Sequence, residues 1–133
     1  MEAQKILKEL KKLDYTIVDK KVADCDLKEY PVKKVKEETL RYIALCASTK
    51  KTLSPSPIVD EYWHQCILHT KLYFQMTKIF GKYLHHDPSD GSKKQNEKNR
   101  IAFWNTIQEY ENNFGEPNVL GIWGLQKKGV KIK

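Results

Sequence analysis

The stretch from Ser56 to Gly81, SPIVDEYWHQCILHTKLYFQMTKIFG, decides the fold that we expect for this chain. Ser56 can cap the first free N–H groups of a helix, and Pro57 suits a first helical turn. Gly81 is a natural helix terminator. Between these signals the apolar side chains fall on one arc of a helix that advances by about 100° per residue. We therefore predict one helix from Pro57 to Phe80, with a core-facing arc of Tyr62, Trp63, Cys66, Ile67, Thr70, Tyr73, Phe74, Thr77 and Phe80.

Helical patterns also flank this stretch on both sides. Residues 3–13, 33–48 and 93–114 each place apolar side chains at helical spacing. Residues 14–31 fit either a short strand or the start of a helix, and further along the chain Trp123 is expected to pin the C-terminal segment onto the domain. The predicted fold is mostly α, a compact single-domain helical bundle of about four to five helices with irregular loops. We expect this domain to span residues 1–126.

Composition narrows the class of protein. The 133 residues carry a net charge of +7. No apolar run approaches the length of a membrane-spanning helix, which needs about 20 residues. Three well-separated cysteines argue against a disulfide framework and favour a reducing compartment, cytoplasmic or nuclear. Arg41 and Arg100 are the only arginines, which disfavours specific nucleic-acid recognition. Residues 127–133 are expected to form a flexible basic tail, with Lys127, Lys128, Lys131 and Lys133 as candidate residues for weak nucleic-acid binding.

All four histidines lie within the 23 residues from His64 to His86. Imidazole, thiolate and carboxylate groups are the usual protein ligands of zinc and other divalent transition metals. We therefore consider a metal site built from His64, His69 and His86, with Asp60, Cys66 and His85 as alternates.

Helical spacing limits which of these side chains can share an ion. Asp60 and His64 are four residues apart and lie on one face, whereas Cys66 and His69 are three apart and lie on another. Either pair would need a histidine from beyond the helix to complete the site. Simpler readings exist for both pairs, because Asp60 near the helix start is favoured by the helix dipole and Cys66 suits the core.

The order of motifs resembles the glycine-rich domain-containing protein-like family. The matching pieces are VDEYWH at 59–64, ILHT at 67–70 followed by Tyr73, FG at 80–81 and HHDP at 85–88. The resemblance covers about residues 37–123. The positions that carry it are Asp60, Trp63, His64, Tyr73, His86 and Pro88.

This chain departs from the family pattern at two positions and at its end. Cys66 stands where the family commonly has a second histidine, and His69 where it often has an aspartate. The glycine-rich tails of plant relatives have no counterpart in this sequence. The resemblance implies no catalytic activity.

Three functional hypotheses follow. The leading one is an intracellular helical interaction or regulatory domain that binds a protein, shows no recognisable catalytic set in its sequence, and relies on His64 and His86 for its structure. The alternative is a metal-binding protein of the zinc type, a hydrolase in one version, that uses the histidine cluster. The third is weak nucleic-acid binding through the lysine-rich tail.

Overall fold

The computed structural model describes residues 2–25, 27, 30–82, 84, 93–117, 119–127 and 130–131. Within these residues the chain is mostly helical, as the sequence predicts, with two short strands near its end. The elements are α1 (Ala3–Leu10), α2 (Thr16–Ala23), α3 (Val32–Ser48), α4 (Pro57–Leu68), α5 (Thr70–Phe80), α6 (Lys93–Phe114), the 3₁₀-helix η1 (Leu120–Trp123), β1 (Leu125–Lys127) and β2 (Val130–Lys131).

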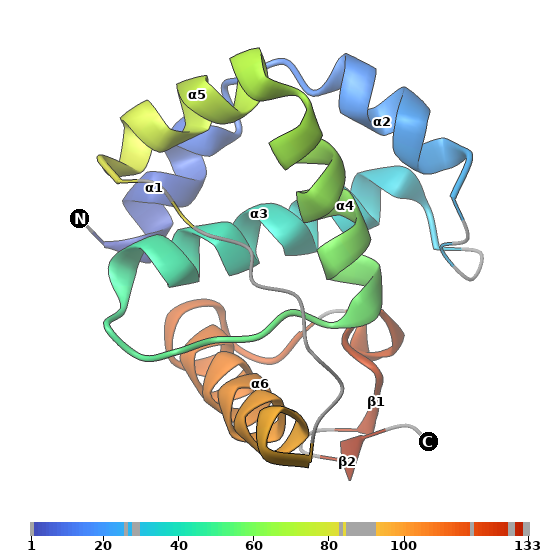
Figure 1. Cartoon of the computed structure of the whole chain (residues 1–133), viewed down its shortest axis with the longest axis vertical. Coiled ribbons are helices and arrows are strands. Elements are labelled where there is room, and N and C mark those ends of the chain that lie inside the picture. The colour runs from blue at the N-terminus through green and yellow to red at the C-terminus, as the bar shows by residue number, and fades with distance from the viewer. Residues whose placement is uncertain are drawn as a thin grey trace.

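Helix α3 forms the centre of the molecule (Figure 1). Helices α1, α2 and α5 lie on one side of it, α6 lies on the other, and α4 crosses it. This position explains why α3 buries residues along most of its length, including Leu40, Ile43 and Leu45. The core therefore lies on both sides of α3, and the family motif on α4 packs directly against it.

The ambiguous segment between α1 and α3 forms a helix. Val18 and Val22, four residues apart in α2, are both fully buried, so they form one apolar stripe of the kind that a helix needs. Tyr15, just before α2, is also buried, and its O–H donates to the carbonyl of Leu10 at 2.7 Å. That bond ties the start of α2 to the end of α1.

The predicted end signals of the motif stretch are confirmed. The Ser56 hydroxyl oxygen accepts from the N–H of Val59 at 3.3 Å, and its O–H donates to the carbonyl of Ile122 at 2.7 Å. Gly81 ends α5 with φ of +71°, a left-handed conformation that glycine adopts without strain. The cap of α4 is therefore also a contact to η1, which holds the C-terminal segment against the helices.

The prediction of one continuous helix from Pro57 to Phe80 is wrong. The chain leaves helical geometry at His69, where φ is −93° and ψ is 82°, and resumes as α5. The break turns α5 so that it packs against α1, with Leu72, Tyr73 and Met76 buried. Phe74 is consequently 61% exposed instead of lying in the core.

The break also explains the helix count. Six α-helices occur in the described residues, against the four to five predicted, because the motif stretch contributes two helices and residues 14–31 contribute another. Strands β1 and β2 pair antiparallel, so backbone pairing extends into the segment predicted to be a tail. No helix in the described part of the chain is long and apolar enough to cross a membrane.

Candidate functional site

The family motif on α4 divides between core and surface. Asp60 lies half-buried in the first turn, where the positive end of the helix dipole favours a carboxylate. Trp63 is buried and meets the ring of Tyr42 edge to face, with centroids 5.5 Å apart. The neighbouring residue His64 is exposed, and its structural role stays a prediction.

Tyr73, the next motif residue, holds the chain beyond α5. It is buried, and its O–H donates to the carbonyl of Leu84 at 2.6 Å. The remaining motif positions, His86 and Pro88, and the alternate ligand His85 lie outside the described residues. Of the described motif residues, Trp63 therefore acts in packing and Tyr73 in fixing the path of the chain.

The histidine cluster does not form a metal centre within the described residues. Cys66 is fully buried, and burial raises the pKa of its thiol to about 12, so it remains a protonated core group. His69 places its Nδ1 atom 2.8 Å from the carbonyl oxygen of Gln65; because a carbonyl only accepts, this nitrogen carries the proton.

No three His, Cys, Asp or Glu side chains come close enough to hold an ion in the part of the chain that the structure describes. The metal site stays a prediction, which the metal content of the untagged protein would test.

A buried carboxylate is the most polar feature of the interior, and the sequence analysis missed it. Glu38 of α3 is 3% exposed. It accepts the Nε1–H of Trp123 at 2.9 Å and the O–H of Tyr110 at 2.7 Å, and its second oxygen accepts from Arg41 Nη1 at 2.9 Å. Arg41 also donates to the Tyr110 hydroxyl oxygen at 2.6 Å. These bonds join α3 to α6 and η1, so we call the four side chains the Glu38 network.

Aromatic contacts surround the Glu38 network. The ring of Trp123 lies 5.6 Å from that of Tyr110 and 6.3 Å from that of Tyr42, which in turn contacts Trp63 of the motif. Burial raises the pKa of Tyr110, and the nearby negative charge of Glu38 raises it further. The Tyr110 hydroxyl therefore keeps its proton and remains a donor. Both oxygens of the Glu38 carboxylate accept hydrogen bonds from other residues of the network, so the carboxylate is suited to structure and not to proton transfer.

A sequence signal for Glu38 did exist. Glu38 lies three residues after Val35 and four before Tyr42, and both of these are buried on the same helix face. A charged residue within the apolar stripe of a helix indicates a buried partner. The partners themselves were not predictable, because they lie 72 and 85 residues further along the chain.

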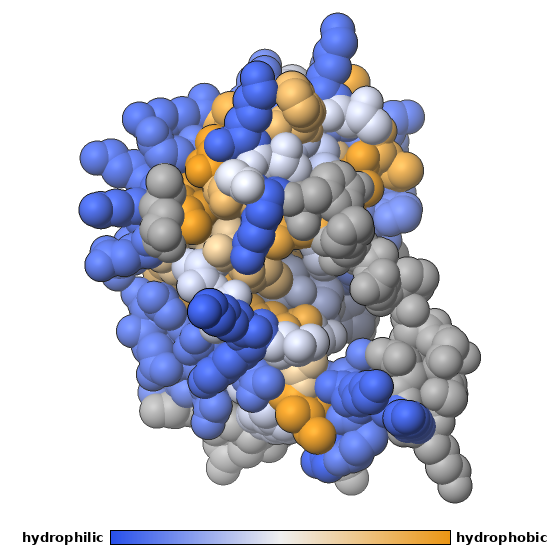
Figure 2. Space-filling view, turned by 60° about the vertical axis from the view of Figure 1, so that its left-hand side comes forward, coloured by the Kyte–Doolittle hydropathy of each residue, from blue (hydrophilic) through white to orange (hydrophobic). Residues whose placement is uncertain are grey.

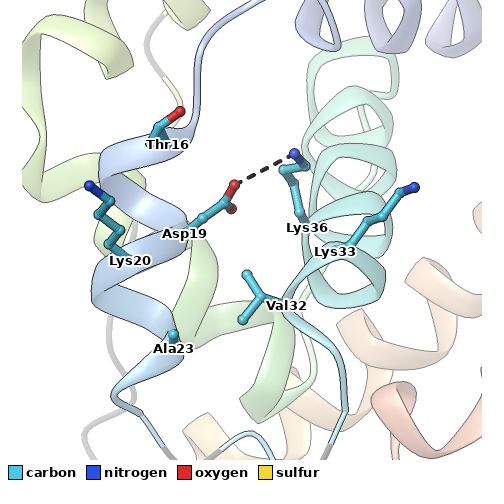
Figure 3. A pocket seen from close by; sticks show the side chains of 7 residues that line it. All are labelled: Thr16, Asp19, Lys20, Ala23, Val32, Lys33 and Lys36. Carbon is cyan, nitrogen blue, oxygen red and sulfur yellow. Dashed lines mark ion pairs between the residues drawn. The ribbon is translucent and has the colours of Figure 1, made fainter.

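A shallow groove of about 530 Å³ runs between α2 and α3 (Figure 3). Lys20, Lys33 and Lys36 line it, and Asp19 is the one acidic residue on its wall. One oxygen of Asp19 accepts the Tyr62 O–H at 2.6 Å and the other lies 3.7 Å from the Lys36 ammonium. Its carboxylate is thus already engaged, which leaves the groove with a net positive charge.

The outer face of α5 is the clearest candidate for a binding surface. Lys71, Phe74, Gln75 and Lys78 are all exposed and lie at helical spacings of three and four, so they share one face, which we call the α5 face. The Lys78 ammonium lies 4.8 Å from the centroid of the Phe74 ring. Leu68, three residues before Lys71, is 58% exposed. Figure 2 shows apolar side chains reaching the surface among hydrophilic ones in the upper part of the molecule, where α5 lies in Figure 1.

The lysines proposed for nucleic-acid binding lie at the end of the chain. Lys127 is the last residue of β1, and Lys131 belongs to β2. Lys128 and Lys133 lie outside the described residues. The nucleic-acid hypothesis therefore stays a prediction.

Comparison with known proteins identifies relatives. A family model described as UCP032817-like matches residues 5–121 and so begins well before the region of resemblance around residue 37. Glycine-rich domain-containing protein 1 of Arabidopsis thaliana is 35% identical over 69 residues, which cover 51% of this chain. The chain spans only 8% of the length of that relative. No solved structure matches the chain.

Proposed function

The chain belongs to the UCP032817-like family and is similar to a glycine-rich domain-containing protein, and from that premise we propose that it is a helical interaction domain whose partner is a protein. The observation that carries the proposal is the exposed position of Phe74 on the α5 face. The opposite side of α5 is packed into the core through Leu72, Tyr73 and Met76, so the helix is a fixed platform.

An exposed aromatic on a fixed helix is well suited to protein binding. Covering a phenylalanine side chain contributes about 1.5–3 kcal/mol, and a rigid ring loses little conformational entropy on binding. Aromatic side chains are enriched in the buried centres of protein interfaces, and polar and charged side chains form the rim around such a centre. Phe74, flanked along α5 by Lys71 and Lys78, has this composition.

Nucleic-acid binding has less support than protein binding. Arg41 is engaged by Glu38 and Tyr110, and Arg100 pairs with Glu97, so both arginines serve contacts within the chain. Binding of single strands uses several aromatic platforms in succession, and Phe74 is the one aromatic among the large apolar side chains that stand exposed in the described residues. We therefore propose a protein partner.

The proposed compartment is cytoplasmic or nuclear. Cys25, Cys46 and Cys66 are free thiols. Unpaired cysteines are typical of reducing compartments, where an interaction domain would meet its partners.

Photo-crosslinking tests the proposed function directly. Phe74 would be replaced by the photoreactive p-benzoylphenylalanine and the chain expressed in cells of the organism that makes it. A control variant would carry the same group in place of Ile101 on α6, which is 54% exposed. We expect a discrete covalent adduct with a protein from the Phe74 position and none from Ile101. Absence of an adduct at Phe74, or the same adducts from both positions, would refute the proposal.

A further inference from the structure

We infer that the partner segment bound by the α5 face is an acidic amphipathic peptide, with an apolar side chain placed between carboxylates. The inference rests on the proposed function and adds the chemistry of the partner to it. It is carried by the juxtaposition of Phe74 with the ammonium groups of Lys71 and Lys78 on one face of α5.

Charge on α5 has a single sign. The helix contains Lys71 and Lys78 and no acidic residue, and Lys82 follows just beyond its end. Neither Lys71 nor Lys78 forms an ion pair with another described residue. The contact that Lys78 makes is with the Phe74 ring. A partner that brings carboxylates to this face would gain two ion pairs at the rim of an apolar contact.

The spacing of these groups defines what the partner must present. Lys71 and Lys78 are seven residues apart, which corresponds to about 10 Å along a helix axis. Phe74 lies between them. A helical peptide lying along α5 would therefore place an apolar residue against Phe74 and acidic residues three or four positions to each side.

Other occupants fit the α5 face less well. A second copy of this chain would bring the same lysines into contact with one another, and the whole chain already carries a net charge of +7. A single-stranded nucleic acid would stack on several exposed aromatic rings in succession, and Phe74 is the one aromatic among the exposed large apolar side chains of the described residues. An anionic membrane would require more than one bulky apolar anchor for stable binding.

Selection from a random peptide library displayed on phage, carried out on the full chain, tests the inference. Peptides retained by the parent protein but not by Phe74→Ala would be sequenced. We expect them to be net acidic, with an apolar residue flanked by Asp or Glu within four positions on each side. Neutral or basic peptides, or no peptide whose capture depends on Phe74, would overturn the inference.

The affinity of the parent protein and of its variants for the most enriched peptide gives a second test of the inference. Fluorescence anisotropy should show binding weakened about tenfold or more by Phe74→Ala and by the double change K71E/K78E. Ile101→Ala on α6 should leave it unchanged. Added salt should weaken the parent's binding and have less effect on that of K71E/K78E.

Three further experiments test the other occupants. They measure binding to a single-stranded poly-thymidine, binding to phosphatidylcholine vesicles that contain phosphatidylserine, and self-association of the protein in sedimentation. Phe74-dependent binding to either of the first two, or Phe74-dependent dimerisation, would overturn the inference of an acidic peptide.

The crosslinking experiment keeps the two proposals distinguishable. If Phe74 crosslinks to a protein and K71E/K78E leaves that adduct undiminished, the acidic partner is refuted and the interaction domain stands. If no adduct forms at Phe74, the proposed function itself fails.

Discussion

Removing the carboxylate of Glu38 should destabilise this protein more than any surface change. In Glu38→Ala, the Tyr110 O–H and the Trp123 N–H both lose their acceptor while remaining buried. Arg41 loses its ion pair but keeps its contact with the Tyr110 oxygen. The change therefore leaves two buried donors unpaired and weakens the contacts that hold α6 and η1 to α3.

The size of the effect follows from these contacts. An unsatisfied buried donor costs about 1–3 kcal/mol, so the two donors account for about 2–6 kcal/mol. The lost ion pair of Arg41 adds to this cost, because its side chain is only 19% exposed and water can replace only part of the pairing. We expect a total of about 3–5 kcal/mol, in the range measured when one partner of a buried ion pair is removed. For a chain of this size, that corresponds to a fall in Tm of about 10–20 °C.

Urea denaturation followed by circular dichroism would measure the loss. Glu37→Ala provides a matched control, because Glu37 is the preceding residue and its nearest cation, Lys34, lies 3.9 Å away at the surface. We expect the control to stay within about 0.5 kcal/mol of the parent. A Glu38→Ala variant within about 1 kcal/mol of the parent would contradict the assigned role of the Glu38 network.

Three further predictions concern thiols, pH and the cap of α4. Burial raises the pKa of Cys66 to about 12 and also raises that of Tyr15, so the folded state keeps protons that the unfolded state loses. Stability should therefore be full at neutral pH and decline as pH rises from about 9 towards 12, which urea midpoints across that range would check; an unchanged midpoint would count against it. Iodoacetamide at neutral pH should modify the half-buried Cys25 well before Cys66, as mass spectrometry of the native protein would show, whereas equal rates would mean that Cys66 is accessible. Ser56→Ala should cost about 1–2 kcal/mol of unfolding free energy, because it removes the α4 cap and the bond to η1, and a thermal melt identical to that of the parent would contradict this.

Structural features that depend on a few neighbouring residues were predictable from the sequence. The Ser56 cap and the Gly81 terminator depend on the conformational preferences of single residues, and both positions behave as predicted. The apolar periodicity of α3 and α6 also predicted their bounds to within a residue or two. These features need no knowledge of distant contacts.

The break at His69 was not predictable in the same way. No glycine or proline marks it, and the side chains on both sides continue a helical pattern. The break instead accompanies the packing of α5 against α1, a helix at least 60 residues earlier in the chain. The same rotation of α5 that buries Leu72 and Met76 brings Phe74 to the surface, so the proposed binding face also depended on tertiary structure.

The candidate site was also predictable in part from local sequence and in part only from the tertiary structure. The family motif located α4 and its packing residue Trp63, whereas the α5 face lay within a stretch that the sequence assigned partly to the core. Glu38 was visible as a charge in an apolar stripe, but its partners Tyr110 and Trp123 are joined to it only by the fold. Local pattern thus identified the elements, and long-range packing determined which faces are free to bind.

The most direct test of the binding role is a map of where an acidic peptide contacts the protein. A peptide with a leucine flanked by glutamates at helical spacing would be titrated into isotope-labelled protein, and amide shifts would be followed by NMR. We expect the largest shifts along α5, around Phe74, with little change along α6. Shifts concentrated on α6, or equal shifts with a peptide in which lysines replace the glutamates, would contradict the assignment of α5 as an acidic-peptide surface.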